Sequence, residues 1–350
     1  MNHRDLCLAA LRREETDRVP CVPLIDLSYA AALANVSVSD CFHAPALHAR
    51  TLEQSLQRHP LIDGLSINLI LAPEVILDRQ PTPDGCLSKT TGGVTWKVPH
   101  NDVGSLAAFE ITSFDDPRLA QVDNLRPGVC QTLKHLSSDT LANYLVCVGV
   151  TGPFSQIVFL MGLDRVLLAT VDEPDELQDA IEARLPLAFD WVDEVAQWNP
   201  AAIWIGEGLA SANLIGPDAY QRFVLPYEYA LAQHIRKHNI CSILHICGSV
   251  EPIIDLIPDS GCDALELDWP VPLDRALQAI GSKMAIKGNL NTTTLVQQSP
   301  QKIYQLSRDL IQQAKGYPGF ILSSGCCVGR DTPPQNIDAM AQASLDAANT

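Results

Sequence analysis

Short runs of apolar residues recur along the chain, and each is followed by a longer segment in which apolar residues return every three or four positions. The short runs are rich in Val, Ile and Leu, which is typical of buried strands, and the longer segments have the period of amphipathic helices. Examples of the helical pattern are residues 163–171, 173–198 and 217–238. The strands that this pattern predicts are 19–25, 64–71, 144–150, 201–206, 242–247, 263–268, 283–289 and 319–325.

Strands that alternate with helices are expected to form a parallel sheet with crossover helices. Eight such units in 350 residues fit a (β/α)8 TIM barrel, which needs about 250 residues plus insertions. A doubly wound α/β sheet is the alternative. The largest insertion, residues 72–140, follows the second strand and contains the turn signals PTPDG and TTGG, which predict a β-hairpin that caps the barrel.

The chain contains no repeat, low-complexity tract or linker that would mark a domain boundary. We therefore expect residues 1–350 to form a single α/β domain, a TIM barrel with an N-terminal extension and a β-hairpin insertion after strand 2.

The charge balance is acidic, with 41 Asp and Glu against 24 Lys and Arg and a net charge of −17. Nucleic acids and anionic membranes are bound through clusters of Lys and Arg, so neither is an expected partner. The N-terminus lacks the long apolar segment of a signal peptide, and no window reaches the ~18 apolar residues of a membrane span. These features favour a cytoplasmic protein, in which most of the eleven cysteines are expected to be reduced and buried.

Chemically reactive residues gather at the predicted strand ends. His245 and Cys247 close the fifth strand and, being two apart, point to the same side; Gly248 then lets the backbone turn away. Cys326 and Cys327 follow the eighth strand. Because the carboxyl ends of barrel strands converge on one mouth, a histidine and two cysteines meeting there would suit zinc with an open fourth position. Ordinary buried core residues are the alternative interpretation.

Several segments spread over nearly the whole chain match a known family. They are RDLCLAALRREETDRVPCVP near the N-terminus, 150–162, 203–227, 244–271, 286–295 and 321–340. The chain also has His-x-Cys and, far downstream, Gly-Cys before a TPxxN segment. In these features it resembles the uroporphyrinogen decarboxylase superfamily and, within it, the MtaA/CmuA-like branch of corrinoid-dependent methyltransferases, which the His-x-Cys and Gly-Cys motifs mark.

The resemblance implies a catalytic Zn²⁺ on His245, Cys247 and Cys326, because these residues match the branch motif; Cys327 stands where the family is variable. It also implies a corrinoid-binding protein as partner and a small-molecule methyl donor or acceptor, such as the thiol coenzyme M or a folate. The direction of methyl transfer stays open.

The decarboxylases proper carry an arginine-rich motif after the first strand. This chain has RVPCVPLIDLSYAAAL instead, with no arginine between Arg18 and Arg50. A tetrapyrrole with many carboxylates would need cationic partners there. Decarboxylation of a tetrapyrrole or another acid is therefore the alternative function.

Other strand-end residues complete the predicted site. Asp268 ends the sixth strand, 21 residues past Cys247, and is the first candidate for a fourth ligand when substrate is absent; a helix-capping carboxylate is the equal alternative. Glu207 ends the fourth strand and is the second catalytic candidate, and Glu266 shares the parity of Asp268. Two further candidates contact the bound ligand or shape its pocket. They are Gly152, in a turn with Pro153, and Asn289, for which a structural hydrogen bond is the equal alternative.

Overall fold

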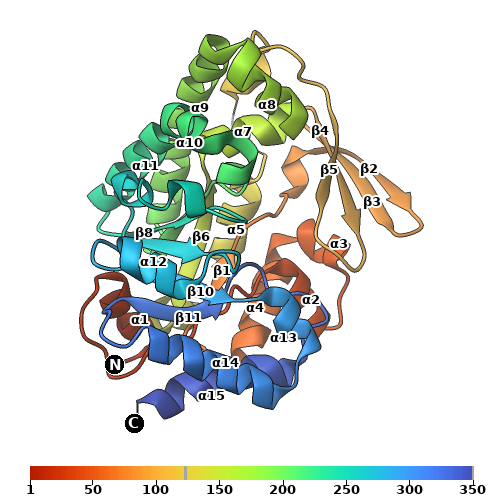
Figure 1. Ribbon diagram of the computed structural model, residues 1–350. Coiled ribbons are helices and arrows are strands. Elements are labelled where there is room, and N and C mark those ends of the chain that lie inside the picture. Colours follow the sequence, from red (N-terminus) through yellow and green to blue (C-terminus); the bar gives the residue numbers. More distant parts are fainter. Residues whose placement is uncertain (122–123, 349–350) are drawn as a thin grey trace.

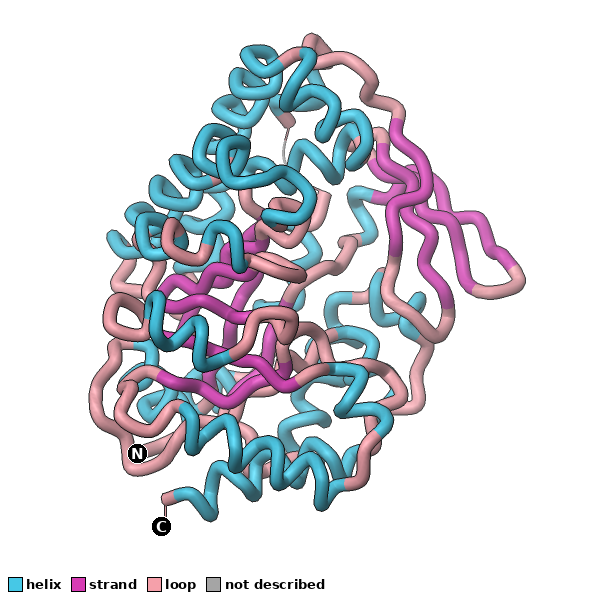
Figure 2. The backbone as a smooth tube through the Cα atoms, viewed as in Figure 1, coloured by secondary structure: helices cyan, strands magenta, loops and turns pink. Residues whose placement is uncertain are grey.

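In the computed structural model, which describes residues 1–121 and 124–348, seven parallel strands form one curled sheet. Each strand pairs with the next along the chain. In order, they are β1 (Gly64–Ile67), β6 (Leu145–Thr151), β7 (Ala202–Gly206), β8 (Cys241–His245), β9 (Ala264–Leu267), β10 (Ala285–Leu290) and β11 (Phe320–Ser324). Helices cover the outside of the curl (Figures 1 and 2). The predicted α/β barrel class is confirmed.

The first predicted strand, residues 19–25, forms only an isolated parallel bridge between Cys21 and Leu322. The segment nevertheless lies between β11 and β1, because Val22 N donates to Leu322 O at 2.8 Å and Asp63 N donates to Cys21 O at 2.8 Å. Two prolines at positions 20 and 23 lack the N–H groups that a regular ladder requires. An irregular segment therefore closes the barrel where the first of eight regular strands was predicted.

Helix α12 (Leu273–Ile280) buries one face, as its apolar spacing predicts. In α12 the residues Leu273, Ala276, Leu277 and Ile280 are all buried, which is the i, i+3, i+4, i+7 pattern of an amphipathic helix. The remaining helices are α1 (His3–Leu11), α2 (Leu27–Leu33), α3 (Val38–Phe42), α4 (Pro45–Arg58), α5 (Arg126–His135), α6 (Ser138–Asn143), α7 (Pro153–Met161), α8 (Leu163–Asp172), α9 (Pro174–Ala196), α10 (Ala212–Phe223), α11 (Leu225–Lys237), α13 (Thr292–Gln297), α14 (Pro300–Gln313) and α15 (Pro334–Ala347); α12 is Leu273–Ile280.

The insertion after β1 is larger than the predicted hairpin. Within the described residues it forms a four-stranded antiparallel sheet of β2 (Ile76–Thr82), β3 (Gly85–Thr90), β4 (Val94–Pro99) and β5 (Ser105–Phe109). This sheet stands beside the barrel, at the right in Figure 1. The turns PTPDG and TTGG join the first three strands as predicted. A hairpin has two strands, so two of the four strands were not predicted; β5, with the sequence SLAAF, shows no alternation of apolar and polar residues.

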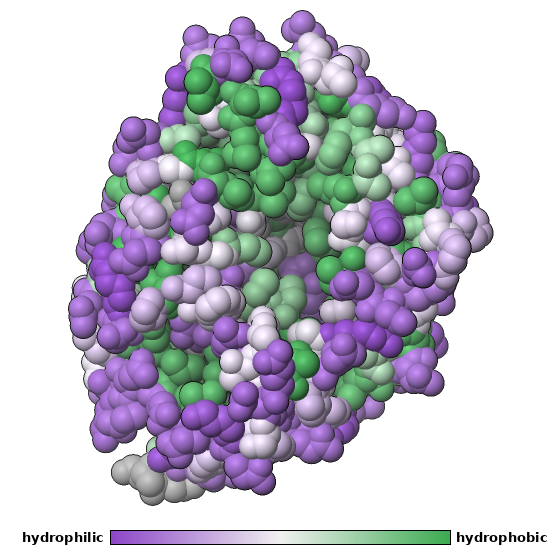
Figure 3. Space-filling model, turned by 45° about the vertical axis from the view of Figure 1, so that its right-hand side comes forward, coloured by the Kyte–Doolittle hydropathy of each residue, from purple (hydrophilic) through white to green (hydrophobic). Residues whose placement is uncertain are grey.

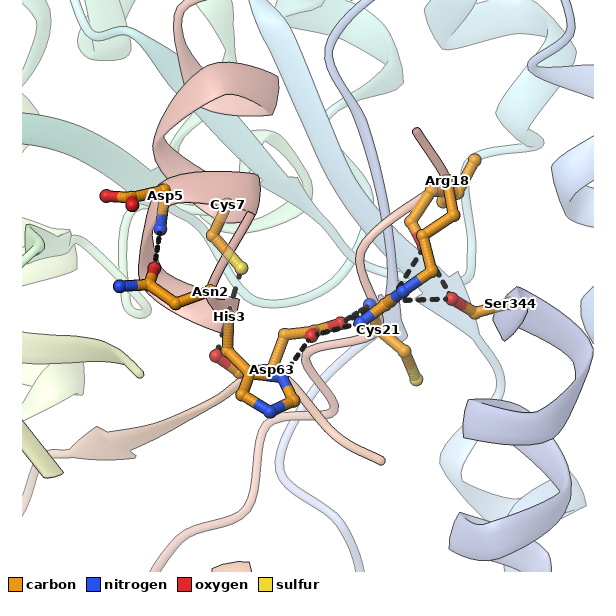
Figure 4. A network of polar contacts seen from close by, with 9 residues as sticks. Asn2, His3, Asp5, Cys7, Arg18, Cys21, Asp63 and Ser344 are labelled. Carbon is orange, nitrogen blue, oxygen red and sulfur yellow. Dashed lines mark hydrogen bonds and ion pairs between the residues drawn. The ribbon is translucent and has the colours of Figure 1, made fainter. Parts of the chain in front are cut away.

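A buried network of polar contacts closes the end of the barrel where the strands begin (Figure 4). Asp63, just before β1, accepts hydrogen bonds from Arg18 Nη2 at 2.6 Å and from Cys21 N at 2.7 Å, and it contacts His3 Nδ1 at 2.7 Å. Burial alone would raise the pKa of Asp63, but the bonds from His3 and Arg18 outweigh it and lower the pKa. Arg18 also donates to Ser344 Oγ on α15 at 3.1 Å.

No single helix in the described part of the chain is long and apolar enough to cross a membrane. The pair α7 and α8 passes that test only when the two are taken together, and the pair bends by 115°.

Candidate metal centre

The mouth of the barrel brings together the three predicted metal ligands. His245 is the last residue of β8, Cys247 follows it by two positions, and Cys326 lies two positions beyond β11. One ring nitrogen of the histidine and the two Sγ atoms all lie within 4.8 Å of one another, and His245 Nε2 is 3.2 Å from Cys247 Sγ. Figure 3 shows a hollow in the middle of one face of the molecule, with hydrophobic residues gathered above it.

The orientation of His245 is held by residues of β7 and β9. Its Nδ1 atom lies 3.3 Å from Glu266 O and 3.4 Å from Glu266 Oε2. The indole of Trp204 stacks on the imidazole with ring centroids 5.1 Å apart. Since Nδ1 faces Glu266, Nε2 faces the thiols. A carboxylate behind a histidine is the usual second layer of a metal site, where it fixes the ring and raises its basicity.

Glu266 belongs to a buried ion pair that the sequence did not reveal. Its carboxylate contacts Lys287 Nζ and accepts a bond from Trp204 Nε1 at 2.6 Å. Lys287 also donates to Ser323 Oγ at 3.1 Å, and both charged side chains are almost fully buried. The signal was present as a lysine inside the apolar strand KMAIKGN, because a buried lysine needs an anionic partner.

The thiols of the site shift one another's pKa values in opposite directions. The Cys247 hydrogen bond lowers the pKa of Cys326, with further lowering from Cys327 and His245, whereas the same Cys326 contact and burial raise the pKa of Cys247. Of the eleven cysteines, all within the described residues and all free, eight are buried and only Cys247, Cys326 and Cys327 are partly exposed. The burial expected of most of the thiols is therefore observed.

Asp268 lies beside the site but turns both oxygens to the backbone. Oδ2 accepts from Gly248 N and Oδ1 accepts from Trp269 N, each at 2.7 Å. Its carboxylate is not part of the close group formed by the histidine and the two cysteines. In this conformation Asp268 holds the turn that follows Cys247, and its role as a fourth ligand stays a prediction.

Glu207 and Gly152 are fitted to each other. Glu207 is fully buried, and its oxygens accept from Ser155 N at 2.9 Å and Phe154 N at 3.3 Å at the start of α7. A Cβ atom on Gly152 would lie 2.0 Å from Glu207 Oε1, so only glycine leaves room for this carboxylate. Burial raises the pKa of Glu207 to about 7.

Asn289 donates from Nδ2 to Val271 O at 2.7 Å. This bond is the structural alternative that the sequence left open for Asn289. The proposed contacts of Gly152 and Asn289 with a bound ligand stay predictions.

A family model described as uroporphyrinogen decarboxylase (URO-D) matches residues 92–346, well over half of the chain. The chain belongs to the uroporphyrinogen decarboxylase family. The resemblance drawn from the motifs is therefore confirmed.

Relatives within the uroporphyrinogen decarboxylase family carry two different names. A methylated-thiol–coenzyme M methyltransferase of Methanosarcina mazei is 28% identical over 195 residues, which cover 55% of this chain and 51% of that protein. A uroporphyrinogen decarboxylase of Geobacter metallireducens is 28% identical over 243 residues, covering 64% of this chain and 69% of that protein. The match thus spans about half the length of the methyltransferase.

Solved structures confirm the fold of this uroporphyrinogen decarboxylase family member. A methyltransferase from Methanosarcina mazei superposes with a TM-score of 0.84 at 19% identity and covers 99% of both chains. A B12-independent methionine synthase from Shewanella sp. W3-18-1 superposes with a TM-score of 0.55 at 11% identity, covering 95% of this chain and 97% of that chain. At these identities the likeness establishes the fold alone.

One polar cluster of the uroporphyrinogen decarboxylase family barrel was missed by sequence reasoning. Asp26, which follows the irregular segment 19–25, lies 3.9 Å from Cys327 Sγ and 4.0 Å from His48 Nε2. In the described part of the chain, Asp26 Oδ1 and both ring nitrogens of His48 are buried without a hydrogen-bond partner. Burial raises the pKa of Asp26 to about 6 and lowers that of His48 to about 3. An aspartate directly after an apolar strand, as in PLID, was the available signal.

Proposed function

We propose that this chain is a zinc-dependent methyltransferase that moves a methyl group between a corrinoid, carried by a partner protein, and a thiol or another small acceptor or donor. The observation that carries the proposal is the group formed by His245 Nε2 and the sulfurs of Cys247 and Cys326 within 4.8 Å. The similarity to a methylated-thiol–coenzyme M methyltransferase supports the same chemistry.

The donor set fits zinc in its chemistry. Two sulfur ligands and one imidazole are a zinc combination, and three protein ligands leave the fourth position open as in catalytic sites. His245 also has the carboxylate behind Nδ1 that metal-bound histidines use. When bound, zinc would supply the positive charge that keeps a substrate thiol ionised near neutral pH.

The residues around the ligands then have defined tasks. Glu266, neutralised by Lys287, fixes the His245 ring, and Asp268 fixes the turn after Cys247. In the thiol-methylating direction, the substrate sulfur attacks the methyl carbon, the C–S bond forms as the Co–C bond breaks, and the electron pair stays on cobalt. The same site run in reverse would load the corrinoid from a methylated donor.

Decarboxylation of a tetrapyrrole is the rival function, because several relatives carry that name. A multiply anionic substrate needs cationic contacts at the mouth. Arg18, the arginine nearest to the first predicted strand, is instead bound to Asp63 at the opposite end of the barrel, and Lys287 is paired with Glu266.

The deciding experiment joins metal analysis to a methyl-transfer assay. The chain is purified without chelators, mixed with methylcobalamin and candidate thiols including coenzyme M, and the cobalamin spectrum is followed. We expect thiol-dependent loss of methylcobalamin that needs zinc and is abolished by Cys247→Ser. No thiol-dependent demethylation in the presence of zinc, together with decarboxylation that survives Cys247→Ser, would overturn the proposal.

A further inference from the structure

A second group of metal-type ligands lies on the outside of the barrel, on α9 and α11. Asp193 comes from α9, His234 from α11, and His238 directly follows α11. The Nε2 atom of each histidine lies 2.7 Å from Asp193 Oδ1, and the three ligand atoms lie within 4.8 Å of one another. None of these residues belongs to the site at the mouth.

The local structure aims both imidazoles at one point. His234 and His238 are four residues apart, so they share one face at the end of the helix. Phe189, one turn before Asp193 on α9, stacks on His234 with ring centroids 4.3 Å apart and an interplanar angle of 13°. The neighbouring Arg236 is turned elsewhere, because its Nη2 donates to Gly261 O at 2.8 Å.

The surroundings also favour a cation. The cluster lies at the carboxyl ends of α9 and α11, where the unpaired carbonyls give each helix partial negative charge. The ligand side chains are 50% (Asp193), 16% (His234) and 33% (His238) exposed, so an ion can enter from solvent. The chain as a whole has a net charge of −17.

We propose that Asp193, His234 and His238 form a second binding site for a divalent transition-metal ion such as zinc, which joins α9 to α11. Two imidazoles and one carboxylate suit such ions, and water can complete the coordination. Helix α11 leads into the start of β8, whereas His245 ends that strand. The second site therefore belongs to the amino-terminal end of the barrel, where residues serve stability rather than chemistry. Zinc bound only by the folded chain raises its melting temperature with increasing zinc concentration.

The test uses the full chain stripped of metal with EDTA and then titrated with Zn²⁺ by calorimetry. We expect His234→Ala/His238→Ala to bind one zinc fewer than the unmodified chain and to lose the zinc-dependent rise in melting temperature contributed by this site. The matched control is His135→Ala, another exposed histidine at the end of a helix, which is expected to bind as the unmodified chain does. Equal zinc stoichiometry and affinity in the double variant and the unmodified chain would overturn the proposal.

A conservative variant separates metal binding from the hydrogen bonds. Asp193→Asn keeps an oxygen that accepts from the histidines but loses the charge. We expect the melting temperature of the metal-free protein to be unchanged. The affinity of this site for zinc should fall by about 10–100-fold or more, and an unchanged affinity would contradict the proposal.

Cobalt distinguishes the two sites without any change to the mouth. Co²⁺ at the cysteine site gives thiolate-to-cobalt charge-transfer absorption, whereas Co²⁺ on Asp193 and the two histidines gives none. In His234→Ala/His238→Ala we expect the cobalt ion without charge-transfer absorption to be lost, because that ion occupies the second site. The charge-transfer absorption from the cysteine site should be unchanged. If the cysteine site binds no cobalt, the loss of cobalt binding without this absorption still tests the second site. The two proposals therefore fail separately.

Discussion

The two ends of the barrel treat buried carboxylates in opposite ways. At the amino-terminal end, hydrogen bonds surround Asp63 and lower its pKa. At the mouth, burial raises the pKa values of Asp26, Glu207 and Asp268, and Asp26 Oδ1 has no hydrogen-bond partner in the described part of the chain. A saturated network stabilises a fold, whereas a buried polar atom without a partner, such as Asp26 Oδ1, is available to a substrate. We therefore associate the amino-terminal end with stability and propose the mouth as the place of the chemistry.

The largest expected effect is on activity at the mouth. Cys247→Ser or Cys326→Ser removes a proposed zinc ligand, and we expect methyl transfer to fall about a thousandfold, since metal activation is worth several kcal/mol. Stability should change much less. The readouts are the rate of methylcobalamin demethylation and urea unfolding. Cys327→Ser is the matched control and should keep most of the rate; equal losses in all three variants would refute the assignment of ligands.

The next largest effect is on stability at the opposite end. Asp63→Asn leaves Arg18 with a neutral partner in a buried setting, and we expect the free energy of unfolding to fall by about 3 kcal/mol, with the rate of the proposed methyl transfer by the folded chain unchanged. Because folding lowers the pKa of Asp63, its stabilisation is present above the ordinary value of 3.8 and is lost as the pH falls through the lower folded-state value.

Urea unfolding measured from pH 7 downwards checks this expectation. The unmodified chain and Asp63→Asn should converge in stability at low pH. The exposed Asp172→Asn serves as the control and should follow the unmodified chain at every pH; a similar loss in both variants would show that Asp63 has no special role.

A smaller loss of stability is expected when Gly152, which leaves room for the Glu207 carboxylate, is replaced by a larger residue. Gly152→Ala forces a methyl group against the carboxylate, and we expect a loss of about 2 kcal/mol from overpacking. Combined with Glu207→Ala, the substitution should cost less than the sum of the two single changes, because the overlap is gone. Thermal unfolding of the three variants measures this coupling, and strict additivity would disprove the contact.

The smallest expected effect is a change in pH dependence. Glu228 is fully buried on α11, Tyr220 donates to its Oε2 at 2.5 Å, and burial raises its pKa from 4.5 to about 8. The folded chain therefore holds a proton that the unfolded chain releases, so stability falls as the pH rises between these values. Glu228→Gln should flatten that decline by roughly 1 kcal/mol between pH 6 and pH 7. Denaturation at both pH values tests this, with the exposed Glu176→Gln expected to keep the original slope.

The sequence predicted the barrel well because the pattern that specifies it is local. The run at 242–247 became β8, Cys241–His245, and Cys247 lies beside His245 as expected, although it stands two residues beyond the end of the strand. The segment 19–25 was apolar enough to predict a strand, but two prolines restrict it to a single bridge. The insertion was underestimated by two strands, and one of its strands, β5, shows no alternation of apolar and polar residues.

The parts of the site that were missed depend on pairing between distant strands. Lys287 and Glu266 are 21 residues apart on neighbouring strands, and neither shows its partner in the local sequence. Asp26 and Cys327 are separated by 301 residues. Such residues are brought together by the register in which neighbouring strands pair and by the curl of the sheet. Neither the register nor the curl can be predicted from the sequence of a single segment.

The irregular segment that closes the barrel also has a consequence for the order of folding. Residues 20–24 bind to β11 through contacts that span about 300 positions, such as Leu24 N with Ser324 Oγ. A ribosome releases β11 long after it has made that segment. On the side that faces β11, the early segment must therefore wait for its neighbour until the last strand of the sheet has been made.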